Sequence, residues 1–210
     1  IMQGSAWISA AKAANAYGTL QLFEVLAMLI AAFFGAIFSL LLSFASINLR
    51  ADQTIGGTAL NLLAPEAIAS VHQAYVDAGA DLITTNTFSS NRISQHEYGL
   101  EAHVRDLNMA GARIARRVAD SCQERQVLVV GSMGPTSKTL SLSTDMAHPE
   151  QRAVGFDDMC EAYREQVEAL LEGGADLLLL ETCYDALNAK AAIYAIEQLG
   201  ERRGLPIPLL

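Results

Sequence analysis

The stretch "GADLLLLETCYD", residues 174–185, places a glutamate directly after four leucines. A run of this kind predicts a strand buried on both faces, beside which an isolated carboxylate would be costly to bury. A second stretch, "GADLITTNTF" at 79–88, begins in the same way. Its Asn86 follows the shared aspartate by five residues, as Glu181 does in the first stretch. The two stretches therefore predict two related strands, each with a polar residue at its end.

From about residue 57 onward, helical and strand patterns alternate along the chain. Amphipathic patterns that each fit a helix lie at 65–79, 99–122, 156–171 and 186–199. Short apolar runs that each fit a strand lie at 82–87, 126–135 and 177–180, and another begins at 205. Strands that alternate with long helices pair in parallel through right-handed crossovers. The pattern therefore predicts an α/β fold, either a (β/α)₈ barrel or a doubly wound sheet.

Two of the helical patterns predict which side chains face the core. The apolar face of the first comprises Ile68, Val71, His72 and Tyr75. The apolar stripe of the second comprises Val104, Leu107, Ala110, Ile114 and Val118. Pro65 suits the first turn of its helix and Gly79 is a typical stop signal, so the limits of the first helix are predicted as well.

An uncharged apolar segment at 25–47 precedes the alternating region. Its 23 residues, at about 1.5 Å per helical residue, could cross a hydrocarbon core of about 30 Å. A buried core helix or the core of a signal peptide is the alternative, although the segment lacks the polar stripe of the former and the basic start of the latter. We therefore divide the chain into an apolar N-terminal segment, 1–50, with a possible transmembrane helix, and a domain at 57–210. A third reading is that 1–50 comes from a truncated or misread coding region.

The formal net charge of the chain is −9, and residues 51–210 hold −10 of it. This balance argues against nucleic-acid binding, which needs a clustered basic face. The cysteines are odd in number and lack CxxC spacing, which indicates a reducing compartment; they are Cys122, Cys160 and Cys183. We therefore expect a cytoplasmic location for the 57–210 domain, with membrane contact through 25–47 if that segment enters a bilayer.

Polar residues at the ends of the predicted strands form a candidate site. In both candidate folds, ligands bind at the carboxyl ends of the parallel strands. Asn86 and Glu181 stand at such ends, and Gly134 with Pro135 ends the strand between them. From position alone, Glu181 serves either a ligand or a structural role, as a cap of the next helix or a partner of a surface cation.

Four segments, in this order and spacing, resemble the homocysteine-binding domain of cobalamin-dependent methionine synthase, in the homocysteine S-methyltransferase family. They are "AYVDAGADLITTNTF" (74–88), "GSMGPTSKTLSLS" (131–143), "FDDMCEAYREQVEALLEGGADLLLLET" (156–182) and "YDALNAKAAIYAI" (184–196). The resemblance covers 57–210. The parts "GPTSKTLSLS" and "DALNAKAA" are more similar to methionine synthase than to the betaine- or S-methylmethionine-dependent relatives.

This resemblance implies about half of a TIM (β/α)₈ barrel that binds homocysteine at its carboxyl face. Glu181 would accept hydrogen bonds from the substrate ammonium group, and Asn86, Thr87 and Gly134 would line the same pocket. In the family, a zinc ion held by three cysteines coordinates the substrate thiol and lowers its pKa from a value near 8.5. The implied methyl donor is methylcobalamin recharged by methyltetrahydrofolate, so cobalamin and folate modules are implied partners.

The chain departs from the family pattern at three places. The family's Asp-Gly-Ala-(Met or Tyr)-Gly-Thr motif has only "ANAYGT" at 14–19 as a weak counterpart. Gly57 and Thr58 replace the Asn-Asp ahead of the "LNLxxP" turn. The strands that carry the zinc-binding cysteines lie beyond Leu210, and neither the dispersed cysteines nor the dispersed histidines, His72, His96, His103 and His148, replace them.

We therefore predict a fragment of a homocysteine S-methyltransferase of the methionine synthase type, with no complete catalytic set. We expect this chain to bind neither zinc nor cobalamin and to be inactive by itself. Open sheet edges in half a barrel would favour association or poor solubility. The alternatives are a membrane-anchored, non-catalytic binding or scaffold protein and a fragment of a cobalamin-independent homocysteine methyltransferase.

Overall fold

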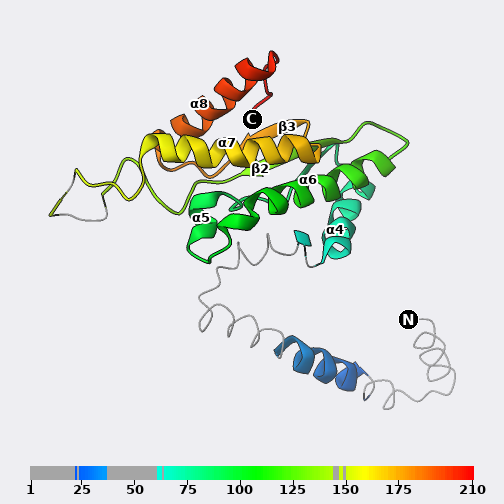
Figure 1. The fold of residues 1–210 in the computed structure, drawn as a ribbon. Coiled ribbons are helices and arrows are strands. Elements are labelled where there is room, and N and C mark those ends of the chain that lie inside the picture. The colour runs from blue at the N-terminus through cyan, green and yellow to red at the C-terminus, as the bar shows by residue number, and fades with distance from the viewer. Residues whose placement is uncertain (1–21, 23, 37–60, 63, 144–146, 149) are drawn as a thin grey trace. The chain divides into compact units, whose positions relative to one another are not determined.

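The computed structural model describes residues 22, 24–36, 61–62, 64–143, 147–148 and 150–210 (Figure 1). The chain divides into two compact units, Ile1–Ala51 and Asp52–Leu210. The sequence predictions for "ANAYGT" at 14–19 and for Gly57-Thr58 lie outside the described residues.

The described part of the first unit is a helix over residues 24–36, with every side chain exposed. Phe33 and Phe34 are 63% and 65% exposed, and their rings meet edge to face at 5.7 Å. Within the described part of the chain, no helix is long and apolar enough to cross a membrane. Residues 37–47 of the predicted apolar span lie outside that part.

The second unit alternates helices and strands, as the sequence predicts. Its elements in order are α4 (Pro65–Asp77), β1 (Leu82–Thr84), α5 (Arg92–His96), the 3₁₀ helix η1 (Glu101–His103), α6 (Val104–Ser121), β2 (Leu128–Met133), α7 (Phe156–Gly173), β3 (Leu177–Leu180) and α8 (Ala186–Arg203). The predicted α/β class is therefore confirmed. The predicted helix at 99–122 is divided into η1 and α6, and the short α5 was not predicted.

The three strands form a parallel sheet in the order β1-β2-β3. Leu82 pairs with Leu128, and Val130 pairs with Leu177. Beyond β3, Leu209 forms a parallel bridge to Leu178. The prediction that a further strand begins near residue 205 is thus supported by a parallel contact at the outer edge of β3.

One face of the sheet is covered by helices, with α6 and α7 lying side by side across it (Figure 1). Ile83, Val129 and Leu178 project from this face into the main hydrophobic core. Because side chains alternate along a strand, Leu82, Ser132 and their in-register neighbours project from the opposite face. Leu82 is 48% exposed whereas Ile83 is 3% exposed, so the opposite face is the more open one at β1.

The predicted core face of α4 is wrong in part. His72 is buried as predicted, but Val71 and Tyr75 are 53% and 63% exposed. The buried face consists of Ala69, His72 and Val76. This second stripe has the same helical spacing, and α4 presents it to the core because α6 packs there. In α6 the predicted stripe is buried except for Ala110, which is half-buried.

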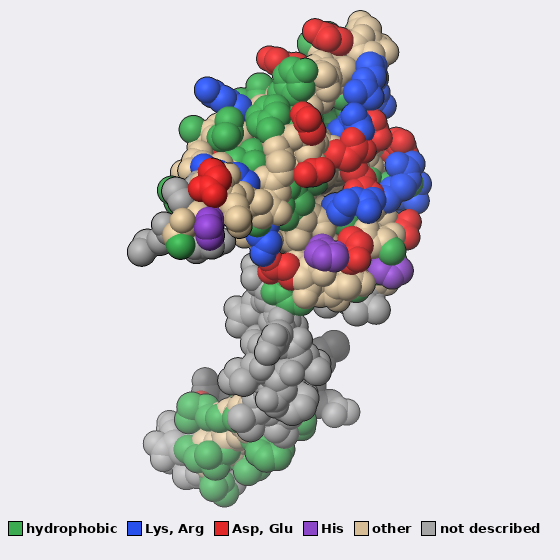
Figure 2. Space-filling model, turned by 60° about the vertical axis from the view of Figure 1, so that its left-hand side comes forward, with side chains coloured by type: hydrophobic (Ala, Val, Ile, Leu, Met, Phe, Trp, Pro, Cys, Tyr) green, Lys and Arg blue, Asp and Glu red, His purple; other side chains and the backbone are tan. Residues whose placement is uncertain are grey.

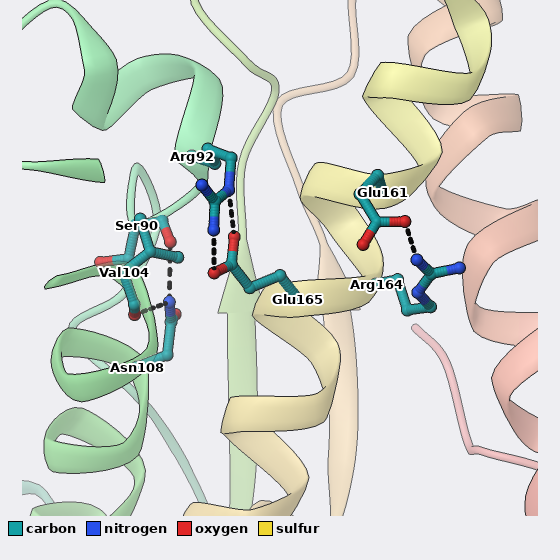
Figure 3. A network of polar contacts seen from close by, with 7 residues as sticks. All are labelled: Ser90, Arg92, Val104, Asn108, Glu161, Arg164 and Glu165. Carbon is teal, nitrogen blue, oxygen red and sulfur yellow. Dashed lines mark hydrogen bonds and ion pairs between the residues drawn. The ribbon is translucent and has the colours of Figure 1, made fainter. Parts of the chain in front are cut away.

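Acidic and basic side chains are interleaved on one side of the second unit (Figure 2). Arg92 on α5 donates two hydrogen bonds, of 2.8 and 2.7 Å, to the Glu165 carboxylate on α7 (Figure 3). Arg116 pairs with Asp176 at 2.8 Å. Solvent-accessible pairs contribute about 0–1 kcal/mol each, so the first joins α5 to α7, and the second joins α6 to the turn before β3, without dominating the stability.

Candidate functional site at the carboxyl edge of the sheet

The three predicted strand-end positions lie at one edge of the sheet. Because β1, β2 and β3 are parallel, their carboxyl ends point the same way. Asn86 follows β1, Gly134 follows β2 and Glu181 follows β3. The topology therefore brings these positions to the edge at which α/β folds bind their ligands.

Glu181 is half-buried and is held by the neighbouring strand. Its carboxylate oxygen Oε1 accepts a hydrogen bond of 2.6 Å from the Ser132 hydroxyl, and its backbone N–H donates to Met133 O at 3.0 Å. Asp185, not Glu181, caps the following helix. Among the described residues, no Lys, Arg or His forms an ion pair with Glu181. Among the described residues, Glu181 is therefore neither the cap of the next helix nor the partner of a surface cation, the two structural roles considered from the sequence.

The backbone turns sharply directly after Glu181. Thr182 has a φ of 60°, in the left-handed region that a β-branched residue adopts only rarely. Such backbone strain persists where the surrounding structure fixes it, and it concentrates at binding and catalytic sites. The strained turn is therefore a second feature, beside the half-buried carboxylate, that marks the end of β3.

Two hydroxyl groups, those of Thr85 and Thr87, connect the chain after β1 to Ser132. Ser132 N–H donates to Thr85 Oγ1 at 3.0 Å, and Thr87 Oγ1 donates to Ser132 O at 2.7 Å. The Thr85 and Thr87 hydroxyl oxygens are 2.6 Å apart. Since Thr87 uses its one hydroxyl proton on Ser132 O, Thr85 is the donor in this pair. The backbone N–H and C=O of Ser132 are thus both held by side chains of the segment that follows β1.

Thr87 supports the edge from inside the protein. Its side chain is fully buried, and its carbonyl oxygen accepts a hydrogen bond of 2.9 Å from Gln166 on α7. Gln166 also approaches Asn108 at 3.3 Å, and Asn108 in turn donates to Ser90 O and Val104 O at 2.7 Å (Figure 3). The structure places Thr87 in this supporting position, and direct contact of Thr87 with substrate stays a prediction.

Gly134 is fixed by the loop that follows β1. Its N–H donates to Phe88 O at 2.8 Å, and its carbonyl oxygen lies 3.2 Å from the Tyr163 hydroxyl oxygen. A Cβ atom at this position would lie 2.4 to 2.7 Å from the Phe88 ring. The close approach of that ring therefore explains why this position has no side chain.

Asn86 lies beside an open cavity of about 650 Å³ between α4 and β1. Its side-chain nitrogen donates to Asn61 Oδ1 at 3.4 Å, and Asn61 Nδ2 donates to Asn86 O at 2.6 Å. His72 also lines the cavity, and burial lowers its pKa. Because Glu181 is not among the residues that line this cavity, a pocket shared by Asn86 and Glu181 stays a prediction.

Asp185 anchors the loop that follows Gly134. Its carboxylate accepts hydrogen bonds from Leu140 N–H at 2.7 Å and from Ser141 N–H and Oγ at 3.1 and 2.5 Å. It also caps α8 by accepting from Leu187 N–H and Asn188 N–H. Burial opposes ionisation of Asp185, but these hydrogen bonds outweigh it and hold the pKa of its carboxyl well below the usual range.

A buried polar group joins the same loop to α7 and α8. The Tyr163 hydroxyl donates to Asn188 Oδ1 at 2.5 Å, and Asn188 Nδ2 donates to Thr136 Oγ1 at 2.9 Å. Burial raises the pKa of Tyr163 well above its ordinary value, so the phenol stays protonated. The loop between β2 and α7 is therefore held at the carboxyl edge by groups from both neighbouring helices.

The comparisons with known proteins identify the family of the chain. The family model for Homocysteine S-methyltransferase matches residues 35–209. The chain belongs to the homocysteine S-methyltransferase family. The match begins inside the apolar segment 25–47, earlier than residue 57, where the sequence resemblance begins.

Solved structures of a homocysteine methyltransferase have a similar fold. The oxidized form of the homocysteine methyltransferase MmuM from Escherichia coli is 25% identical, with a TM-score of 0.56 over 70% of this chain and 52% of that chain. The metallated form is 23% identical, with a TM-score of 0.57 over 74% and 56%. The chain thus spans about half the length of these solved methyltransferases.

The described residues do not fit the zinc site implied by the family resemblance. Cys122 follows α6, Cys160 lies on α7 and Cys183 follows Glu181, and all three are free thiols. In the part of the chain that the structure describes, no three His, Cys, Asp or Glu side chains come together to hold a metal ion. We therefore assign no chemical step at this edge to a metal.

Two residues at this edge were not predicted from the sequence. Ser132 is the one hydroxyl residue within the apolar strand β2, which is a weak signal. Asp185 ends the "ETCYD" string and is the N-cap of α8. An aspartate directly before a helical pattern is the sequence signal that identifies such a cap. Neither signal indicates which distant residues these side chains contact.

Proposed function

We propose that the carboxyl edge of this sheet binds the amino-acid part of homocysteine, with Glu181 accepting hydrogen bonds from the substrate ammonium group. The observation that carries this proposal is the half-buried Glu181 carboxylate, held through one oxygen by Ser132 and without a cationic partner among the described residues. A charge-assisted hydrogen bond of this type contributes about 1.5–3 kcal/mol. An ammonium ligand would supply a cationic partner for this carboxylate, which has none among the described residues.

The architecture that we propose is about half of a (β/α)₈ barrel. Its support is the parallel order β1-β2-β3, the added bridge at Leu209 and the helix on each connection. In such a barrel, the open face of the sheet, to which Ser132 belongs, would face the interior, and its carboxyl edge would form part of the mouth. The likeness to about half of the MmuM chain supports the same architecture.

The parent reaction that we propose is methyl transfer to the homocysteine thiol: the bond between the methyl carbon and its donor breaks, a carbon–sulfur bond forms, and the products are methionine, the demethylated donor and the thiol proton. The residues described here would bind and orient the amino-acid end of the substrate. The sequence segments "GPTSKTLSLS" and "DALNAKAA" favour the methionine synthase type of donor, methylcobalamin. We expect this 210-residue chain by itself to hold no stoichiometric zinc and to show no turnover; metal analysis after addition of zinc, and a methionine assay, test both expectations.

Calorimetric titration with L-homocysteine tests the binding proposal. The matched ligand is 4-mercaptobutanoate, which is homocysteine without its ammonium group. We expect saturable binding of homocysteine and at least about tenfold weaker binding to Glu181→Gln, because the carboxylate charge is lost. Glu197→Gln, an exposed glutamate on α8, is the control and should bind as the wild type does. Absence of binding, or equal binding by Glu181→Gln, would refute the proposal.

A further inference from the structure

Ser132 occupies an unusual position within the sheet. It lies in the central strand β2, is 3% exposed, and is paired in register with Leu179 on β3. Side chains two residues apart on a strand share a face, so Ser132 and Glu181 project from the same side of the sheet. That side is opposite to the one that α6 and α7 cover.

The Ser132 hydroxyl is directed at Glu181 by its surroundings. Its backbone N–H and C=O are both bonded to hydroxyl groups that follow β1, those of Thr85 and Thr87. Its own hydroxyl donates to Glu181 Oε1 at 2.6 Å, a short distance typical of a charge-assisted bond. This bond engages one carboxylate oxygen, and Oε2 has no hydrogen-bond partner among the described residues.

We propose that Ser132 is a positioning residue that fixes the Glu181 carboxylate, so that its second oxygen faces the ligand. This inference rests on the proposed function of Glu181. A glutamate side chain has several rotamers, and ordering it on binding costs affinity, whereas a side chain already held in place avoids that cost. Thr85 and Thr87 hold Ser132 in turn, so the end of β1 contributes to the geometry at the end of β3.

Removal of the hydroxyl tests the role of Ser132 in binding. We expect Ser132→Ala to bind homocysteine about tenfold more weakly and to bind 4-mercaptobutanoate as the wild type does, because only homocysteine engages Glu181. Ser132→Thr retains the hydroxyl and should restore most of the affinity. Ser70→Ala, which removes an exposed hydroxyl on α4, is the control. An equal loss for both ligands, or no loss, would overturn the proposal.

A double-mutant cycle tests the same contact without ligand. Urea unfolding of Ser132→Ala, Glu181→Ala and the double variant should be non-additive, with the double variant less destabilised than the two single losses together. Additive losses would show that Ser132 does not hold Glu181 and would overturn the inference. If the wild type bound no homocysteine while the cycle was non-additive, the proposed function would fail and the positioning of Glu181 by Ser132 would stand.

Discussion

After β1 the chain is fixed by neutral amide groups, whereas after β3 it is fixed by a carboxylate. Asn108 and Gln166 donate to backbone carbonyls of the loop that follows Asn86. Asp185 accepts from backbone N–H groups of the loop between β2 and α7, and it caps α8 after Glu181. The same sequence pattern, Gly-Ala-Asp followed by a strand, is thus followed by segments that are held in two different ways, by amide groups after β1 and by a carboxylate after β3.

This difference has a physical consequence for the candidate site. An amide network carries no titrating group, so its strength does not depend on pH in the range where proteins are folded. The hydrogen bonds that a carboxylate accepts are strong while it is ionised and weak once it is protonated. The stability of the segment after β3 should therefore depend on pH and on a single residue, Asp185. The stability of the segment after β1 should depend less on either.

The largest effect is expected from Asp185→Ala. The variant leaves the N–H groups of Leu140 and Ser141 without their acceptor and removes the cap of α8. We expect the free energy of unfolding to fall by about 3 kcal/mol, measured by urea unfolding. Asp77→Ala, which removes an exposed carboxylate on α4, should change it by less than about 0.5 kcal/mol. A loss below about 1 kcal/mol for Asp185→Ala would contradict the anchoring role.

A smaller effect is expected from Asn108→Ala, which removes a support of the loop after β1. The carbonyl oxygens of Ser90 and Val104 would lose their buried donor. We expect a loss of about 2 kcal/mol in the same unfolding assay, with Gln73→Ala on the exposed side of α4 as the control. Equal stability of Asn108→Ala and the wild type would show that the amide network does not support the loop after β1.

The smallest and most discriminating effect is expected in how the free energy of unfolding depends on pH. The pKa of Asp185 is lower in the folded chain than its unfolded value of about 3.9. Its contribution to stability is therefore complete above that value and is lost as the pH falls through the folded pKa. The stability difference between the wild type and Asp185→Asn should be largest at neutral pH and shrink below about pH 4.

The corresponding difference for Asn108→Ala should stay constant over the same pH range, because no titrating group is removed. A constant difference for Asp185→Asn, measured by urea unfolding at successive pH values, would contradict the assignment of the carboxylate as the pH-dependent support.

Local patterns predicted most of the fold. Alternating periodicities identified the long helices and the three strands, because each depends on residues close in sequence. The short helix α5 was missed because its five residues, Arg92–His96, are too few for a helical period. The buried face of α4 was mistaken because two stripes had suitable spacing, and only its packing against α6 selects between them.

The candidate site was predicted to a lesser extent. The parallel topology explains why Asn86, Gly134 and Glu181 could be assigned to one edge from position alone. The role of Ser132 depends on the register of β2 against β3, and Asp185 bonds to residues 44 and 45 positions away in the chain. Contacts of this range follow from three-dimensional packing, so a local sequence pattern does not reveal them.

Nuclear magnetic resonance of the ¹⁵N-labelled chain during addition of L-homocysteine tests the central claim most directly. That claim is that the carboxyl edge of the sheet, and Glu181 in particular, receives the amino-acid end of the ligand. We predict saturable shifts of the Ser132 and Glu181 amide signals, with little change on the outer helices α6 and α7. Shifts confined to other parts of the chain, or no saturable shift at all, would contradict the claim.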